Sequence, residues 1–255
     1  MAVVALASAS GSPGVTTTAL GLALLWPRPV LLVEADPTGG SGLLAGYFRG
    51  TKEYDAGLIE LALTASNLSD ALADIARPID GTTVSYVAGT RAHTQAGALR
   101  DLWAPLAETL SELEATGQDV IVDAGRLGLH GSPEPLLDAA DLTLLVSRTT
   151  LPNLSALRSW AEVVQRPALD WHQSALLLVG EGQPYSVRDV AAAVRLPVLA
   201  SLPDDPGSAA VFSRGAQPPK KFEIGPLARG LNAAIASIHS TISHRRNELL
   251  EGARS

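Results

Sequence analysis

The chain contains no cysteine in 255 residues, which excludes disulfide bonds, thiolate metal sites and cysteine nucleophiles. Aromatic residues make up only 4% of the chain, so the core must consist mainly of alanine, leucine and valine, which suits helices packed on a parallel sheet. The five histidines show no pair at metal-ligand spacing, which argues against a histidine metal centre. The net charge of −7 gives no overall basic field for nucleic acid or acidic lipid, and a local basic patch stays open as an alternative.

The amino-terminal segment also lacks the positive charge of a secretory signal, because no lysine or arginine precedes Arg28. Pro13 and the threonine triplet 16–18 interrupt the apolar run before it reaches the length of a membrane-spanning helix. We therefore expect a cytoplasmic protein.

Short apolar runs alternate with helical patterns along the whole chain. This alternation predicts an α/β fold with right-handed crossovers and one mostly parallel central sheet that carries helices on both faces. About seven strands are expected, at 2–8, 30–36, 82–89, 119–125, 142–147, 174–180 and 197–203. Helices are expected at 16–26, within 55–76, and at 95–116, 133–139, 153–166, 186–194 and 225–250. No linker interrupts the pattern, so residues 1–255 are expected to form a single domain closed by the helix at 225–250.

Three of these strands end in glycine-rich or acidic segments: SGSPGVTT follows the first, EADPTGG the second and DAGRLG the fourth. Because the carboxyl ends of parallel strands lie at one edge of a sheet, the three segments should converge there. The first segment also precedes a helix, whose N terminus offers free N–H groups and a positive dipole end to an anion. Together they predict a phosphate-binding site.

These motifs resemble those of the ParA/MinD family, the deviant Walker A ATPases with a P-loop NTPase-like fold. The family loop reads K-G-G-V-G-K-T-T before a helix similar to L-A-L-N-L-A, and this chain reads S-G-S-P-G-V-T-T and then T-A-L-G-L-A. The segments at 30–40, 119–125, 140–157 and 196–215 are similar to later family motifs, so the resemblance covers about residues 2–215.

The resemblance implies that ATP and Mg²⁺ are the ligands. It implies that Asp36 orients the attacking water and that Thr16 and Asp123 hold Mg²⁺. The resemblance implies that the nucleotide is bound by Gly11, Ser12, Gly14, Val15, Thr16 and Thr17. Two arginines near the same sheet edge, Arg126 and Arg148, are further candidates for nucleotide binding.

The phosphate loop departs from the family at two charged positions. Ser10 stands where the family has its signature lysine, and Val15 stands where it has the P-loop lysine. Loss of one such donor costs about 3 kcal/mol of transition-state stabilisation in comparable sites. Arg126 or Arg148 would substitute if its guanidinium reached a phosphate, and the alternative is that both are solvated loop arginines.

The sequence therefore favours a positioning or assembly protein with weak or absent ATP hydrolysis, acting as a homodimer that recruits an unidentified protein partner. Two alternatives stay open: an active Mg²⁺-dependent ATPase that uses a substitute arginine, and a structural scaffold that binds no nucleotide. The helix at 225–250 carries an apolar stripe, for which packing against its own sheet is favoured over contact with a membrane or a partner.

Overall fold

The computed structural model describes residues 2–65, 67–164, 171 and 173–252. Its strands form one eight-stranded sheet in the order β3-β4-β2-β5-β1-β6-β7-β8. All the pairings are parallel except the antiparallel pair of β3 and β4, so the mostly parallel α/β fold is confirmed. The strands are β1 (Val3–Ser8), β2 (Val30–Glu34), β3 (Arg77–Pro78), β4 (Val84–Val87), β5 (Asp119–Arg126), β6 (Leu142–Arg148), β7 (Ser174–Val179) and β8 (Val198–Leu202).

The expected seven strands are all present, and β3 is the one that the sequence did not predict. It has only two residues, too few for any hydrophobic pattern, and it lies at the edge of the sheet. Pro78 is tolerated there because an edge strand does not need every backbone N–H for the ladder.

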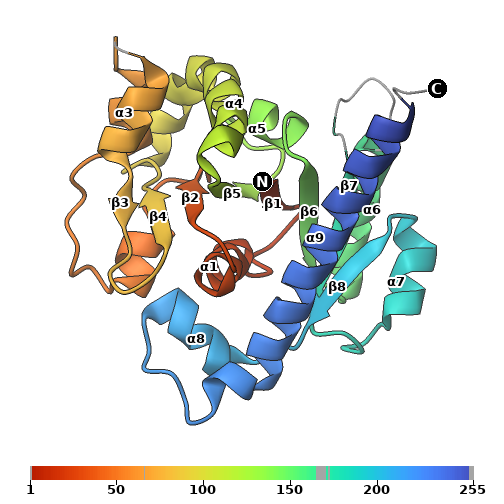
Figure 1. Cartoon of the computed structure of the whole chain (residues 1–255). Helices are drawn as coiled ribbons and strands as arrows, with labels where there is room; N and C mark the ends of the chain where they lie inside the picture. The colour runs from red at the N-terminus through yellow and green to blue at the C-terminus, as the bar shows by residue number, and fades with distance from the viewer. Residues whose placement is uncertain (1, 66, 165–170, 172, 253–255) are drawn as a thin grey trace.

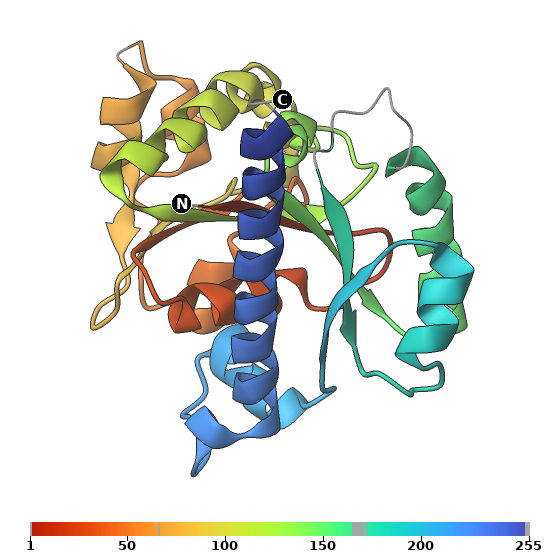
Figure 2. The ribbon, with the colours of Figure 1, turned by 45° about the vertical axis from the view of Figure 1, so that its right-hand side comes forward.

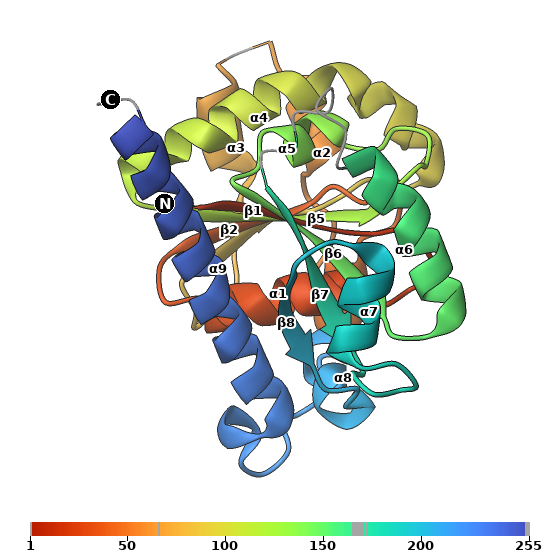
Figure 3. The same cartoon turned by 90° about the vertical axis from the view of Figure 1, so that its right-hand side faces the viewer.

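Helices cover both faces of the sheet, as Figures 1 and 3 show. One face packs against α1 (Val15–Leu25), the π-helical turn η1 (Leu43–Tyr47), α8 (Pro206–Arg214) and α9 (Pro226–Gly252). The other face packs against α2 (Leu58–Ala62), α3 (Leu68–Ile75), η2 (His93–Leu102), α4 (Trp103–Glu112), α5 (Glu134–Asp138), α6 (Leu151–Val164) and α7 (Val187–Val194). Short 3₁₀ turns, η3 (Leu113–Thr116) and η4 (Phe222–Ile224), complete the described elements.

The two faces explain why the strands appear in the sequence as continuous apolar runs. In β1, Val3 and Ala5 belong to one apolar cluster, whereas Val4 and Leu6 belong to the cluster on the opposite face. A strand that is buried on both sides has no polar face and therefore shows no alternation.

Three helical segments differ from expectation. The segment expected as one helix at 95–116 is divided into η2, α4 and η3. The helix expected at 153–166 begins earlier, at Leu151, and its positions 165 and 166 lie outside the described residues. Helix α8 was not predicted, although Asp205 caps it by accepting a hydrogen bond from Ser208 N and Pro206 occupies its first turn.

Helix α9 packs along the sheet with the apolar stripe that the sequence predicted, and Figure 2 shows it running the length of the molecule. The stripe is buried at Leu227, Leu231, Ile235, Ile238 and Ile242. Beyond Ile242 the helix leaves the core, and Leu249 and Leu250 are exposed. Among the described residues no helix has the length and apolar character needed to cross a bilayer.

Candidate functional site

A cavity of about 790 Å³ lies at the carboxyl ends of the strands, beside the N terminus of α1. Its lining brings together the nucleotide-binding residues expected from the sequence: Gly11, Ser12, Gly14, Val15, Thr16, Thr17, Arg126 and Arg148, together with Asp36. Asp123 lies beneath this lining and is almost completely buried. The volume falls within the range of small-molecule sites in proteins.

The loop between β1 and α1 has the backbone of an anion-binding loop. Gly11 and Gly14 both lie in the left-handed region, with φ of +64° and +102°, which residues with a side chain rarely adopt. Gly14 is the N-cap of α1 and offers no side-chain acceptor to the first turn of the helix. The N–H groups of that turn therefore face the cavity without a side-chain cap, where an anion can accept from them.

The two positions that have lysine in the family hold uncharged side chains here, Val15 and Ser10. The Val15 side chain is only 6% exposed and belongs to the apolar cluster beneath α1. The Ser10 hydroxyl donates to Oδ1 of Asn153 in α6 at 3.3 Å. The loop itself therefore brings no positive side chain to the cavity.

Thr16 and Asp123 are in direct contact below the loop, since the Thr16 hydroxyl hydrogen-bonds to the Asp123 carboxyl group. Gly125 N also donates to Asp123 Oδ1 at 3.1 Å. Burial is the largest influence on this carboxyl group and raises the pKa of Asp123 from 3.8 to about 7, and the neighbouring charges of Asp36 and Glu34 act in the same direction. The pair that the sequence assigned to Mg²⁺ is thus assembled, with a carboxyl group that is readily protonated.

Asp36 lies above this pair, on the loop after β2. Its Oδ1 accepts a hydrogen bond from Thr38 N at 2.8 Å. A Cβ atom at position 125 would lie 2.2 Å from Asp36 Cγ, so a side chain there would displace the Asp36 carboxyl group, and the φ of +63° at this position also favours glycine. The Asp36 loop is also joined to the segment after β4, because Gly40 N donates to Thr90 O at 2.8 Å.

Glu34, at the end of β2, has a structural role that the sequence did not reveal. Its carboxylate accepts hydrogen bonds from the Ser41 hydroxyl, from Leu43 N at 2.8 Å and from Gly89 N at 3.3 Å. Burial raises the pKa of Glu34 above its ordinary value, and these hydrogen bonds partly oppose that effect. The residue ties the start of η1 and the end of β4 to β2.

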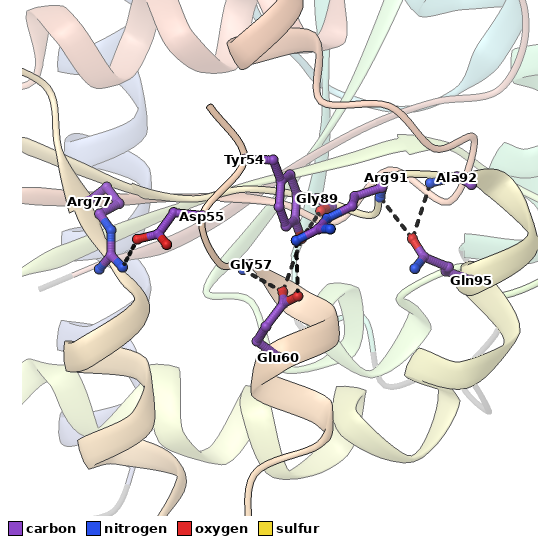
Figure 4. Close-up of polar contacts among 9 residues, drawn as sticks. All are labelled: Tyr54, Asp55, Gly57, Glu60, Arg77, Gly89, Arg91, Ala92 and Gln95. Atoms are coloured by element: carbon purple, nitrogen blue, oxygen red, sulfur yellow. Dashed lines mark hydrogen bonds and ion pairs between the residues drawn. The ribbon is translucent and has the colours of Figure 1, made fainter. Parts of the chain in front are cut away.

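The segment after β4 is anchored on its outer side by the cluster in Figure 4. The Tyr54 hydroxyl donates to Gly89 O at 2.8 Å, and burial is the main reason that the pKa of Tyr54 is raised to about 12. The Arg91 guanidinium lies 4.2 Å from the centre of the Tyr54 ring and pairs with Glu60 at 3.4 Å. This cluster supports the segment after β4, and none of its three side chains is part of the cavity lining.

Three arginines line the cavity, and they differ in their partners. Arg148 Nη1 forms an ion pair with Asp204 Oδ2 at 2.7 Å, so its charge is already neutralised. Arg126, at the end of β5, makes no side-chain hydrogen bond or ion pair with any part of the chain that the structure describes. Arg214, the last residue of α8, is the third arginine. Arg214 was not predicted as a site residue. The one local pattern that pointed to α8 was its N-cap, Asp205, nine residues before Arg214.

The described residues contain no group of three or more histidine, cysteine, aspartate or glutamate side chains placed to hold a metal ion. Thr16 and Asp123 supply one hydroxyl and one carboxyl group at this position. Mg²⁺ is bound in many proteins by one or two such groups together with phosphate oxygens and water, and this donor set fits that arrangement.

The parallel sheet and the glycine loop before α1 define the class, a P-loop NTPase-like α/β fold. No family model matches the chain, and no curated protein matches it. Solved structures do match, and they have the ParA/MinD fold.

The septum site-determining protein MinD from Pyrococcus horikoshii, solved with Mg-ADP, has a TM-score of 0.71 at 18% identity, covering 93% of this chain and 95% of that chain. MinD in the MinC:MinD complex from Aquifex aeolicus has a TM-score of 0.74 at 13% identity, with coverages of 94% and 96%. A ParA family ATPase from Chlorobium tepidum has a TM-score of 0.73 at 13% identity, with coverages of 93% and 98%. The chain therefore has the ParA/MinD-like fold.

Proposed function

We propose that this chain is a ParA/MinD-like positioning or assembly protein that binds an adenine nucleotide and hydrolyses it weakly or not at all. One observation carries the proposal: the loop keeps its left-handed glycines and its Thr16–Asp123 contact, while Val15 is buried at the P-loop lysine position. The backbone of a phosphate site is thus retained without the charge that stabilises phosphoryl transfer.

The retained residues fit the proposed ligands in a definite way. Thr16 and Asp123 would hold Mg²⁺ together with phosphate oxygens, and the N–H groups at the start of α1 would receive a phosphate. Asp36 would orient a water molecule if hydrolysis occurs. The MinD structure solved with Mg-ADP has the same fold, which supports this choice of nucleotide and metal.

We further propose that the protein acts as a homodimer in the cytoplasm and recruits a protein partner through the strand-end face. The MinC:MinD complex supports the recruitment of a partner, because a protein of the same fold assembles with another protein. In this chain Leu151 is 64% exposed at the start of α6, two residues before the Asn153 that contacts Ser10. That side chain would give a second copy an apolar contact beside the cavity.

The test is calorimetric titration of ATP and of ADP, each with Mg²⁺, into the wild type and Thr16→Ala. Thr94→Ala is the matched control, because Thr94 is exposed in η2, away from the cavity. We expect micromolar binding by the wild type and the control, weaker binding by Thr16→Ala, and little or no phosphate release. Steady ATP turnover that Asp36→Ala abolishes would contradict weak hydrolysis. Absence of heat at millimolar nucleotide would contradict nucleotide binding and leave the scaffold alternative.

A second candidate function, an active ATPase, is favoured by one observation: Arg126, which has no partner among the described residues, lines the cavity. In that case Arg126 would supply the charge that the loop lacks. Mg²⁺-dependent turnover that disappears in Arg126→Ala would establish it over the first proposal.

A further inference from the structure

The positive charge available in the cavity comes from two elements that are distant in the sequence. Arg126 extends from the end of β5 and Arg214 from the end of α8. Both side chains are exposed, and neither makes a side-chain hydrogen bond or ion pair within the described ranges. Arg148 is different, because Asp204 neutralises it at 2.7 Å. In the part of the chain that the structure describes, two cavity arginines are thus free to bind an anion that enters.

The backbone at Arg126 is held beside the phosphate loop. In the parallel pairing of β1 with β5, residue 126 lies opposite Ser8, the last residue of β1. The next residue locks this register, since Leu127 N donates to Ser8 O at 2.9 Å. Arg126 therefore starts from the rigid sheet, directly beside the chain that turns into the loop.

The backbone at Arg214 is fixed by close packing of the end of α8 against η1, which lies far away in the sequence. A Cβ atom at Gly46 would lie 2.6 Å from Ser213 O, and one at Gly215 would lie 2.0 Å from Tyr47 O. Both glycines therefore let the end of α8 press against η1. Gly215, with φ of +57°, also ends the helix, so Arg214 is its final residue.

Helix α8 in turn packs closely on α1, and Figure 1 shows the two helices as neighbours on the same side of the sheet. A Cβ atom at Gly21 of α1 would lie 3.2 Å from Phe212 Cε2, so the contact leaves little room between the helices. The end of α8 is thus fixed relative to the loop that precedes α1.

We infer that Arg126 and Arg214 together form a clamp for the phosphate groups of a nucleoside diphosphate or triphosphate, in place of the lysine that Val15 does not provide. This inference rests on the proposed function, because it assigns residues to the same site. Each guanidinium offers planar, paired N–H donors that match phosphate oxygens. The ligand would join α8 to β5 and hold the cavity wall to the sheet.

Arg214 has an alternative explanation as a helix-terminal cation. A positive side chain in the last turn of a helix interacts favourably with the helix dipole. That role affects the free energy of unfolding and leaves ligand affinity unchanged, so the two explanations predict different measurements.

The test is calorimetric titration of Mg-ADP and of inorganic tripolyphosphate into the full chain and its variants. We expect Arg126→Gln and Arg214→Gln each to weaken binding of both probes about tenfold, which corresponds to about 1.4 kcal/mol. Arg214→Lys should fall between the wild type and Arg214→Gln, because it keeps the charge and loses the fork. Arg229→Gln is the matched control, since Arg229 is exposed on α9 and does not line the cavity. It should bind like the wild type.

Urea unfolding of each variant shows that it is folded and tests the helix-terminal role. If the wild type binds Mg-ADP and both glutamine variants bind as tightly as Arg229→Gln, the clamp is wrong and the proposed nucleotide binding stands. Lower stability of Arg214→Gln with unchanged affinity would likewise overturn the clamp in favour of the dipole role. If the wild type binds neither probe, the proposed function fails and the clamp fails with it.

Discussion

The buried carboxyl group of Asp123 makes the free energy of unfolding depend on pH. Its pKa is raised from 3.8 to about 7 in the folded protein, so between these values the folded protein keeps a proton that the unfolded chain has lost. Stability therefore falls as pH rises through this range. One pKa unit corresponds to about 1.4 kcal/mol, so the full effect is about 4 kcal/mol, of which roughly 2.5 kcal/mol lies between pH 5 and 8.

The assay is urea unfolding of the wild type and Asp123→Asn at intervals from pH 5 to pH 8. The wild type should lose roughly 2.5 kcal/mol over this range through Asp123, and the variant should lack that part of the slope. Glu34 adds to the slope in both proteins, because burial raises its pKa as well. Parallel pH profiles for the two proteins would refute the reasoning, as would wild-type stability that rises with pH.

Three further substitutions test the geometry of the site. Gly125→Ala should lower stability by more than Gly182→Ala. Both positions have a positive φ, which costs about 1–2 kcal/mol, but only at 125 does the new Cβ meet Asp36. Equal losses in urea unfolding would show that the Asp36 contact is absent. Val15→Lys should tighten Mg-ATP binding at least about tenfold, and unchanged affinity in calorimetry would show that the loop cannot direct a lysine to the phosphates. Arg148→Gln should cost about 1 kcal/mol or less, since the ion pair with Asp204 is partly exposed, and a larger loss in urea unfolding would contradict this.

Much of the fold follows from local patterns in the sequence. A strand buried on both faces appears as a short apolar run whatever its neighbours are, and the seven strands with such runs were predicted. Strand β3 and helix α8 were missed for local reasons. The former has only two residues, and the latter contains Gly207 and serines, which favour helix weakly.

The loop residues of the candidate site were also predictable, because they are contiguous and their spacing carries the motif. Gly11, Gly14 and Thr16 line the cavity as expected, and Thr16 meets Asp123 from a strand more than a hundred residues away. That meeting was foreseen only because parallel strands end at one edge of the sheet.

The sequence by itself thus determined the order of seven strands and of most helices along the chain, the position of the phosphate loop and the loss of both loop lysines. Only the tertiary structure decided which charges are available at the cavity. It pairs Arg148 with Asp204 and brings Arg214 to the cavity that Arg126 also lines. The physical reason is that backbone conformation responds to near neighbours in the sequence, whereas the partner of a charged side chain depends on which distant segments pack together.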